Sequence, residues 1–135
     1  MNAQYRELID QARQARLHSY SPYSGFRVGA ALLTAAGEVF TGTNVENASF
    51  GLSICAERTA VVKAVSAGYT CFTAIAISAD GPTPTPPCGA CRQVLMEFAP
   101  EMTVLCGSES GEPEIYPLGD LLARPFINFR PGDRT

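Results

Sequence analysis

Hydrophobic positions in the first half of the chain form one periodic stretch and two apolar runs, which predict one helix and one β-hairpin. Over residues 3–18 they recur every three to four positions, as on one face of an amphipathic helix. The apolar stripe of this helix comprises Leu8, Ile9, Ala12 and Ala15. The Ser, Pro and Gly content of residues 19–25 is typical of a loop. Apolar runs over 26–34 and 39–46, separated by a tight turn, predict two paired strands.

The second half of the chain alternates between helices and strands, without repeats or an internal linker. The expected elements are a helix over 56–68, a strand over 72–79, a helix over 91–99, strands over 102–107 and 114–117, and a short helix over 118–123. A proline-rich loop occupies 81–87, and the tail 124–135 is irregular. We therefore expect one domain over 1–135, with helices covering a central sheet. The strand–helix–strand units that begin at residue 72 should place their strands parallel.

The composition excludes several classes of protein. Hydrophobic residues make up 46% of the chain and charged residues 17%, which is typical of a globular domain and not of a disordered one. No apolar run approaches the roughly 20 residues of a membrane span. The polar first ten residues lack the apolar segment of a secretion signal. We therefore expect a cytoplasmic protein that has no membrane partner.

Charge and cysteine usage narrow the choice further. The net charge is −3 and the positive residues are scattered, whereas a groove for a phosphate backbone needs clustered Lys and Arg. No nucleic-acid polymer is therefore expected as a partner. Five cysteines are an odd number in a chain without a secretion signal, so we expect reduced thiols. In that setting, closely spaced cysteines bind metal or take part in chemistry.

Two cysteines lie three positions apart in the segment PPCGACRQ. At the start of a helix this spacing places Cys88 and Cys91 on one face, and the positive N-terminal end of the helix favours thiolates. Pro86 and Pro87 stiffen the entry into the helix. The motif by itself leaves two interpretations open, a redox pair or half of a metal site.

A third cysteine and a glutamate occur together in the segment CAERTA, which also opens a helix. The thiolates of Cys55, Cys88 and Cys91, at two helix starts, can hold zinc tetrahedrally and leave one position open for water or substrate. Glu57 does not share a helix face with Cys55. We therefore expect Glu57 to handle protons beside the open position and not to bind the metal.

The remaining cysteines and two arginines bear on this hypothesis. A structural zinc would take Cys71 or Cys106 as its fourth ligand, but we interpret both as buried small residues beside strands. A zinc ion with three thiolates carries a formal charge of about −1, which weakens its ability to acidify water. We expect Arg58 and Arg92 to offset this charge by donating hydrogen bonds to sulfur.

The segment CAE, followed about thirty residues later by PCGAC, is similar to the signature of the zinc-dependent cytidine deaminases in its all-cysteine form. The resemblance to the small, homotetrameric members of this family extends over nearly the whole chain. Its segments are FRVGAALLT, NVENASFG, ICAERTA, PCGACRQV and LL-x-x-x-F near the end. It implies an α/β fold, a three-layer α/β/α sandwich around a mixed five-stranded sheet.

The resemblance also implies an activity. This is the zinc-dependent hydrolytic deamination of cytidine and 2'-deoxycytidine to uridine and 2'-deoxyuridine, with release of ammonia, in pyrimidine salvage. Cys55, Cys88 and Cys91 would hold one Zn²⁺ per subunit. Glu57 would take a proton from the water at the metal and deliver protons to N3 and to the leaving amine. Backbone groups near Ala56 and Cys88 would orient the base.

Four further residues are candidates for contacts with the nucleoside. Asn44 and Glu46 alternate along the predicted strand and share a face, and an amide beside a carboxylate suits a sugar hydroxyl. Without the resemblance, the simpler interpretation of Asn44 and Glu46 is a solvated strand end. The simpler interpretation of Phe26 is a core residue. The resemblance instead assigns Asn44 and Glu46 to ribose and Phe26 to the side of the pyrimidine. It assigns Phe126 to the base in a neighbouring subunit of a homotetramer, whose active sites lie at subunit interfaces.

Three functions stay open at this point. The first is the deamination of free cytidine and deoxycytidine, and the second is the same chemistry on a related nucleoside, such as blasticidin S, or on a nucleotide. The NVEN segment favours an ordinary ribose, and the lack of a basic phosphate pocket disfavours a monophosphate. The third is a non-catalytic zinc or redox module, which would have no need of Glu57.

Overall fold

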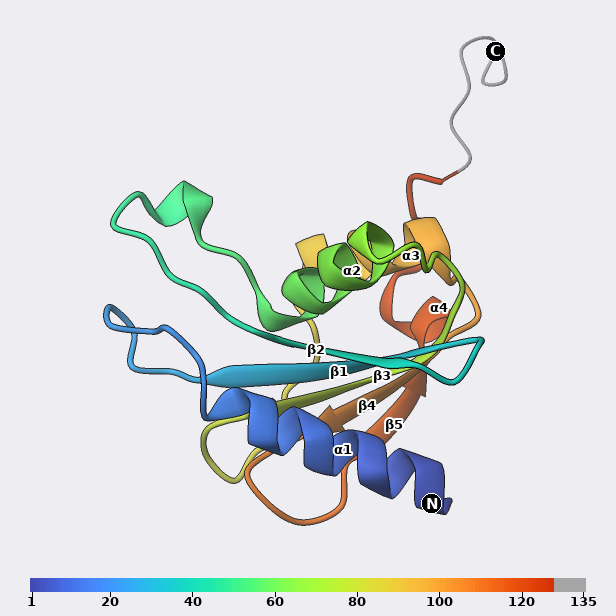
Figure 1. Ribbon diagram of the computed structural model, residues 1–135, viewed down its shortest axis with the longest axis horizontal. Coiled ribbons are helices and arrows are strands. Elements are labelled where there is room, and N and C mark those ends of the chain that lie inside the picture. The colour runs from blue at the N-terminus through green and yellow to red at the C-terminus, as the bar shows by residue number, and fades with distance from the viewer. Residues whose placement is uncertain (128–135) are drawn as a thin grey trace, which may run out of the picture.

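A five-stranded mixed β-sheet forms the middle layer of the protein, in a computed structural model that describes residues 1–127 (Figure 1). The strands are β1 (Val28–Thr34), β2 (Val39–Thr43), β3 (Phe72–Ala79), β4 (Thr103–Gly107) and β5 (Glu114–Pro117). Their order is β2-β1-β3-β4-β5. Strands β3 and β4 pair parallel, and the other neighbours pair antiparallel. The expected parallel pairing therefore holds for β3 and β4, whereas β5 returns antiparallel because a short turn, not a helix, connects it to β4.

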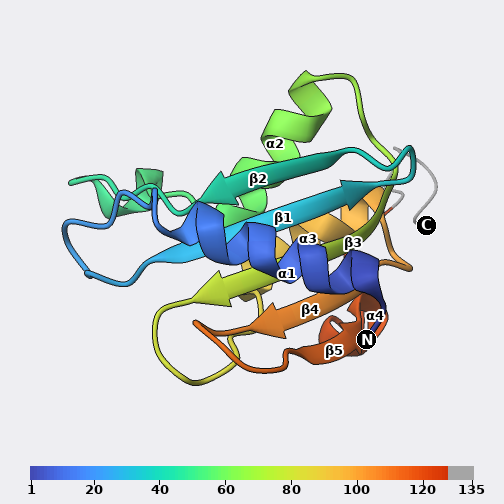
Figure 2. The same ribbon diagram turned by 60° about the horizontal axis from the view of Figure 1, so that its bottom comes forward.

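Helices cover both faces of this sheet, so the expected three-layer sandwich is confirmed. The helices are α1 (Ala3–Arg16), α2 (Ala56–Ser66), α3 (Gly89–Phe98) and α4 (Leu118–Leu121). Figure 1 shows α1 alone below the sheet and the other three helices above it. Figure 2 shows α1 lying across the central strands β1 and β3. A short 3₁₀ helix, η1 (Phe50–Leu52), lies in the loop between β2 and α2.

Side chains of the central strands alternate between two apolar cores, as the period of two in a strand requires. The core beneath α2 and α3 contains the strand residues Ala30, Leu32, Ile75, Ile77, Val104 and Cys106. The core against α1 contains the strand residues Ala31, Leu33, Ala74, Ala76 and Leu105. Burying one large side chain such as that of Ile75 contributes about 1.5–3 kcal/mol. The same strands therefore anchor helices on both faces.

Two glycines let the helices lie directly on the sheet. A Cβ atom at Gly29 would stand 2.2 Å from the carbonyl oxygen of Ala12 in α1. A Cβ atom at Gly42 would stand 2.5 Å from the carbonyl oxygen of Ala56 and 2.5 Å from the amide nitrogen of Ala60, both in α2. The first turn of α2 is thus seated on β2, which fixes where the segment CAERTA begins its helix.

The paired strands are shorter than the apolar runs predicted. Strand β1 begins at Val28 instead of Phe26, and β2 ends at Thr43 instead of residue 46. The amide of Val28 donates to the side-chain oxygen of Asn44, 2.9 Å away, instead of to a backbone carbonyl. The amide of Asn44 still donates to the carbonyl of Val28, at 3.2 Å, so the side chain takes the place of the reciprocal ladder bond only, and the regular pairing ends at this pair.

The last residues of the predicted tail, 128–135, lie outside the described part of the chain. The predicted single domain over 1–135 and its irregular tail can therefore be compared with the structure only up to residue 127. Within 1–127, no helix is both long and apolar enough to cross a membrane.

Candidate active site

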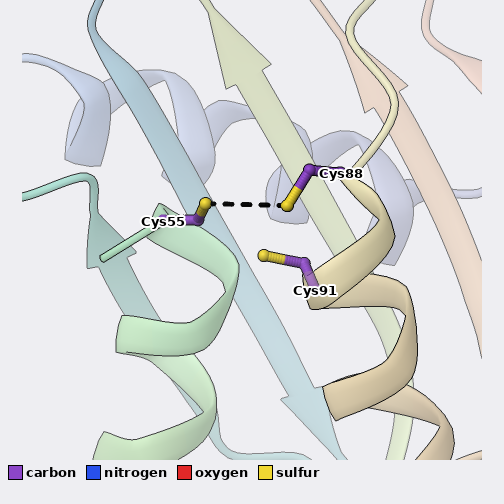
Figure 3. Close-up of side chains that lie close together, drawn as sticks. All are labelled: Cys55, Cys88 and Cys91. Atoms are coloured by element: carbon purple, nitrogen blue, oxygen red, sulfur yellow. Dashed lines mark hydrogen bonds between the residues drawn. The ribbon is translucent and has the colours of Figure 1, made fainter. Parts of the chain in front are cut away.

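Three cysteine side chains converge between the N-terminal ends of α2 and α3 (Figure 3). Cys55 is the N-cap residue of α2, Cys88 is the N-cap residue of α3, and Cys91 lies in the first turn of α3. Both N-cap residues have extended backbones, and neither side chain caps its helix. The sulfurs therefore point toward one another. All three lie within 4.8 Å of one another, and those of Cys55 and Cys88 are 3.8 Å apart.

This arrangement fits a tetrahedral zinc ion. With zinc–sulfur bonds of about 2.3 Å, two ligands of a tetrahedron stand about 3.8 Å apart. Among the described residues, the three cysteines are the only group of His, Cys, Asp or Glu side chains arranged to hold a metal. Neither Cys71 nor Cys106 belongs to the group. The donor set therefore fits a three-sulfur site with one open position.

The two remaining cysteines differ from each other in burial. Cys106 is buried in β4, as expected. Cys71 is exposed, so its interpretation as a buried small residue was wrong. It immediately precedes β3 at the end of the connection from α2, where the chain passes over the surface.

Electrostatics around the sulfurs favour a thiolate at Cys55. A hydrogen bond from the Cys91 thiol, together with the guanidinium of Arg58, outweighs burial and lowers the pKa of Cys55 to about 5. Donating that hydrogen bond raises the pKa of Cys91. Nη2 of Arg58 lies 3.5 Å from the sulfur of Cys55, as the sequence predicted. The partial positive charge at the N-terminus of α2 acts in the same direction.

Glu57 lies in the first turn of α2 and is 4% exposed. Burial raises the pKa of its carboxyl to about 7, and the negative charge of Cys55 adds to the effect. The carboxyl lines the same cavity as Cys55 and Cys88. A buried carboxyl at the wall of an open cavity is suited to accept and return protons.

The arginine and glutamine that follow Cys91 hold the C-terminal segment. Arg92 donates to the carbonyl oxygens of Pro87, at 2.8 Å, and Leu121, at 2.7 Å. Arg92 was expected to donate to sulfur, but its hydrogen bonds instead connect the loop before Cys88 to the end of α4. The side-chain amide of Gln93 donates to the carbonyl of Phe126 and accepts from its amide, at 2.6 Å and 3.0 Å.

A cavity of ≈ 340 Å³ opens beside the sulfurs. Its lining residues come from the loop before β1, the segment between β2 and α2, the proline loop, the starts of α2 and α3, and single positions in β1 and β3. Predicted site residues in this lining are Phe26, Asn44, Glu46, Cys55, Ala56, Glu57 and Cys88. Residues of the lining that the sequence did not single out are Ser24, Val28, Ser53, Ile54, Ile77, Thr85 and Pro86. Phe126 does not line this cavity and is 57% exposed.

Phe26 is not a core residue, so the interpretation from hydrophobicity alone was wrong. Its side chain is 43% exposed and forms part of the cavity wall. The available signal was its neighbourhood, because the loop SYSPYSG directly precedes it and loops carry binding residues more often than strands do.

Asn44 makes hydrogen bonds that connect three backbone segments at the edge of the cavity. Its amide nitrogen donates to the carbonyl of Phe26 at 2.8 Å. Its side-chain oxygen accepts from the amide of Val28 and from the hydroxyl of Ser19. Asn44 is therefore not merely a solvated strand end.

Glu46 holds the loop that precedes Phe26. One of its carboxylate oxygens accepts from the amides of Tyr23, at 2.9 Å, and Ser24, at 3.1 Å. The other oxygen accepts from the hydroxyl of Ser24. The hydrogen bond from that hydroxyl, supported by those from the two amides, outweighs the opposing effect of burial and lowers the pKa of Glu46. Glu46 therefore lies at the cavity as an ionised acceptor.

Comparison with known proteins agrees with this site. The family model described as "Cytidine and deoxycytidylate deaminase zinc-binding region" matches residues 2–107. A cytidine deaminase of Halalkalibacterium halodurans is 51% identical over 120 residues, covering 88% of this chain and 91% of that protein. A cytidine deaminase of Sporosarcina psychrophila is 45% identical over 121 residues, covering 89% of each chain.

Among solved structures, the cytidine deaminase of Burkholderia pseudomallei superposes with a TM-score of 0.87 at 47% identity. The superposition covers 93% of this chain and 100% of that one. The family match, the relatives and the shared fold agree with the resemblance carried by CAE and PCGAC. The chain therefore belongs to the cytidine and deoxycytidylate deaminase family.

Proposed function

We propose that this protein is a cytidine deaminase, which hydrolyses cytidine and 2'-deoxycytidine to uridine and 2'-deoxyuridine with release of ammonia. The observation that carries the proposal is the cluster of three cysteine sulfurs, of which Cys55 and Cys88 line one cavity together with the buried Glu57. Relatives that are named cytidine deaminases and match over most of the chain support it.

In this proposal Cys55, Cys88 and Cys91 hold one Zn²⁺ per chain. The ion supplies a Lewis acid that makes a water molecule acidic enough to react near neutral pH. Arg58 offsets part of the negative charge of the three thiolates through its contact with Cys55. Arg92 contributes by fixing the carbonyl of Pro87, next to Cys88.

Glu57 moves the protons of the reaction. It would accept a proton from the attacking water and donate it to N3 of the base, and would then accept the proton of the new hydroxyl at C4 and donate it to the amine, which leaves as ammonia. Its burial supports this role, because a carboxyl with a pKa near neutrality can both accept and release a proton. The first backbone N–H groups of α2, around Ala56, have no partners inside the helix and are available to orient the base.

Asn44 and Glu46 bind the sugar, and their remaining hydrogen-bonding capacity matches a hydroxyl. The amide nitrogen of Asn44 uses one of its two N–H groups on Phe26, which leaves one donor. The carboxylate of Glu46 accepts three hydrogen bonds out of about four it can take, which leaves one acceptor site. One donor beside one acceptor can recognise a single sugar hydroxyl, while the exposed ring of Phe26 flanks the pyrimidine.

The charge of the cavity favours a nucleoside over a nucleotide. Its lining contains two carboxylates, those of Glu46 and Glu57, and no Lys, Arg or His among the described residues. A 5'-phosphate would therefore enter without a cationic partner. Blasticidin S is not the preferred substrate in this proposal, because the matched relatives carry the name cytidine deaminase.

We also propose that the active form is a homotetramer with its active sites at subunit interfaces, in the cytoplasm. Apolar side chains exposed near the cavity support this assembly. The side chains of Phe50 and Leu52 are 73% and 70% exposed. The rings of Phe50 and Tyr23 pack edge-on, with their centroids 5.8 Å apart. In this assembly Phe126, held by Gln93, would pack over the base in a neighbouring subunit.

An absorbance assay on the purified protein tests the proposal, with zinc content measured on the same sample. Cytidine and deoxycytidine should be converted by protein that carries about one zinc per chain. Cytidine monophosphate and blasticidin S should react far more slowly. No conversion of either nucleoside by zinc-loaded protein would contradict the proposal, and a preference for the monophosphate would contradict the substrate assignment.

A further inference from the structure

Ser24 lies at the edge of the cavity, between two residues assigned to substrate binding. Its hydroxyl contacts the carboxylate of Glu46 on one side and the backbone amide of Phe26, 3.0 Å away, on the other. It also lines the cavity itself. Of the residues 19–25, Ser24 is the one whose side chain joins the sugar-binding and base-flanking positions.

The directions of these two hydrogen bonds are fixed. The amide of Phe26 can only donate, so the hydroxyl oxygen of Ser24 must accept there. The carboxylate of Glu46 can only accept, so the hydroxyl proton of Ser24 must point toward it. The chain from Phe26 through Ser24 to Glu46 therefore has one orientation. It restrains the rotamer of the carboxylate and the backbone position of Phe26 together.

The backbone of the same loop strengthens this restraint. The amides of Tyr23 and Ser24 both donate to the carboxylate oxygen of Glu46 that the Ser24 hydroxyl does not contact. Two amides hold one oxygen and one hydroxyl holds the other, so the plane of the carboxylate is set. The remaining acceptor site belongs to the oxygen that Ser24 contacts, because this oxygen accepts only one of the three bonds.

We propose that Ser24 is a positioning residue for the sugar: its hydroxyl orients the carboxylate of Glu46 so that the last acceptor site faces one sugar hydroxyl. This inference rests on the proposed function. Ser24 need not touch the substrate, and it acts through Glu46. The effect of Ser24 should therefore depend on whether the substrate carries the hydroxyl that Glu46 recognises.

The test compares Ser24→Ala with the unchanged protein on cytidine and on 2'-deoxy, 2',3'-dideoxy and 5'-deoxy analogues. The analogue on which the unchanged protein loses most activity identifies the recognised hydroxyl. On cytidine, Ser24→Ala should lower kcat/KM by about 10- to 150-fold, the range of one hydrogen bond to a charged group, mainly through KM. On the identified analogue, that penalty should fall to about twofold or less.

Two control variants keep the test specific. Ser24→Thr retains the hydroxyl and should restore kcat/KM to within about threefold of the unchanged protein. Ser49→Ala removes a hydroxyl from the neighbouring exposed loop, where the side chain caps no helix, and should leave all four substrates unaffected. Zinc content and the unfolding midpoint of each variant show that the comparison is between folded proteins.

The outcomes separate this inference from the proposed function. If the unchanged, zinc-loaded protein does not deaminate cytidine, the proposed function fails and the inference fails with it. If the protein is active but Ser24→Ala lowers kcat/KM by the same factor on every analogue, Ser24 only stabilises the loop, and the inference alone is overturned. Equal activity of the unchanged protein on all analogues also overturns it, because no sugar hydroxyl is then recognised.

Discussion

The two halves of the cavity are built by different means. The metal half comprises the cavity residues Cys55, Glu57 and Cys88 together with Cys91 of the same sulfur cluster, all within or next to the first turn of a helix. The sugar half comprises Ser24, Phe26, Asn44 and Glu46, all in segments outside the regular helices and strands. Helix geometry positions the first group, and hydrogen bonds between side chains and distant backbone position the second.

This difference indicates how each half responds to substitution. A cysteine of the metal half has its direction set by a helix that packs on the sheet, so losing its sulfur removes a ligand without unfolding the helix. A residue of the sugar half holds the loop that it belongs to, so losing its side chain loosens several neighbours at once. We expect substitutions of the zinc-binding cysteines to abolish zinc binding and activity, and substitutions in the sugar half to reduce activity only in part.

The largest effect is expected for Cys88→Ala. With only two sulfurs left, the site should lose both zinc and detectable deaminase activity, because a three-ligand site has no spare ligand. Metal analysis and the absorbance assay measure the two losses. Cys71→Ala is the matched control, since this exposed cysteine lies outside the cluster, and it should retain both properties. A full equivalent of zinc in Cys88→Ala would point to a different set of ligands.

Glu57→Gln should have the next largest effect and should separate metal binding from chemistry. The amide has nearly the same shape but cannot carry a proton between atoms, so kcat should fall by about 10²- to 10⁴-fold. Zinc content should stay at the level of the unchanged protein. Glu97→Gln, on the exposed side of α3, is the control for a loss of negative charge. Nearly normal turnover by Glu57→Gln would remove this residue from the mechanism.

Asn44→Ala should have the smallest effect of the three and should be confined to the sugar half. The variant loses the hydrogen bonds to Phe26 and Val28 and the remaining donor for the sugar. We expect kcat/KM to fall about tenfold, as for one or two neutral hydrogen bonds, with zinc content unchanged. Asn47→Ala, just outside the cavity, is the control. Loss of zinc from Asn44→Ala would show that the two halves are coupled, and would contradict the view that they are built independently.

The sequence could predict how the cysteines lie within each helix of the metal half, because that part of the geometry is local. An N-cap cysteine and a first-turn cysteine stand on one face of any helix that begins at that point. The mistaken assignment of Arg92 arose beyond that local range. Its guanidinium meets the carbonyl of Leu121, which the fold brings back from the C-terminal segment, and no pattern around position 92 indicates that neighbour.

In the sugar half, the local sequence predicted less and the fold decided more. Hydrophobicity placed Phe26 in the core and extended both strands too far, because the pattern does not register that a side chain of Asn44 can replace a ladder bond. The resemblance to a family named Asn44 and Glu46, but it did not indicate Ser24. Their hydrogen bonds join positions some twenty residues apart along the chain, and such pairs are set by how the loops meet.

By itself, the sequence determined the order of helices and strands, the composition of a three-sulfur site and the family. The elements follow from periodicities, and the cysteine site from short motifs, that each span a few residues, whereas the family follows from the resemblance carried by CAE and PCGAC. Only the tertiary structure decided that α2 and α3 bring their first turns together, that the sulfurs of Cys55 and Cys88 stand 3.8 Å apart, and that the loop with Ser24 closes on Glu46. The physical reason is that these distances depend on how the helices pack on a shared sheet, with Gly42 letting α2 lie against β2.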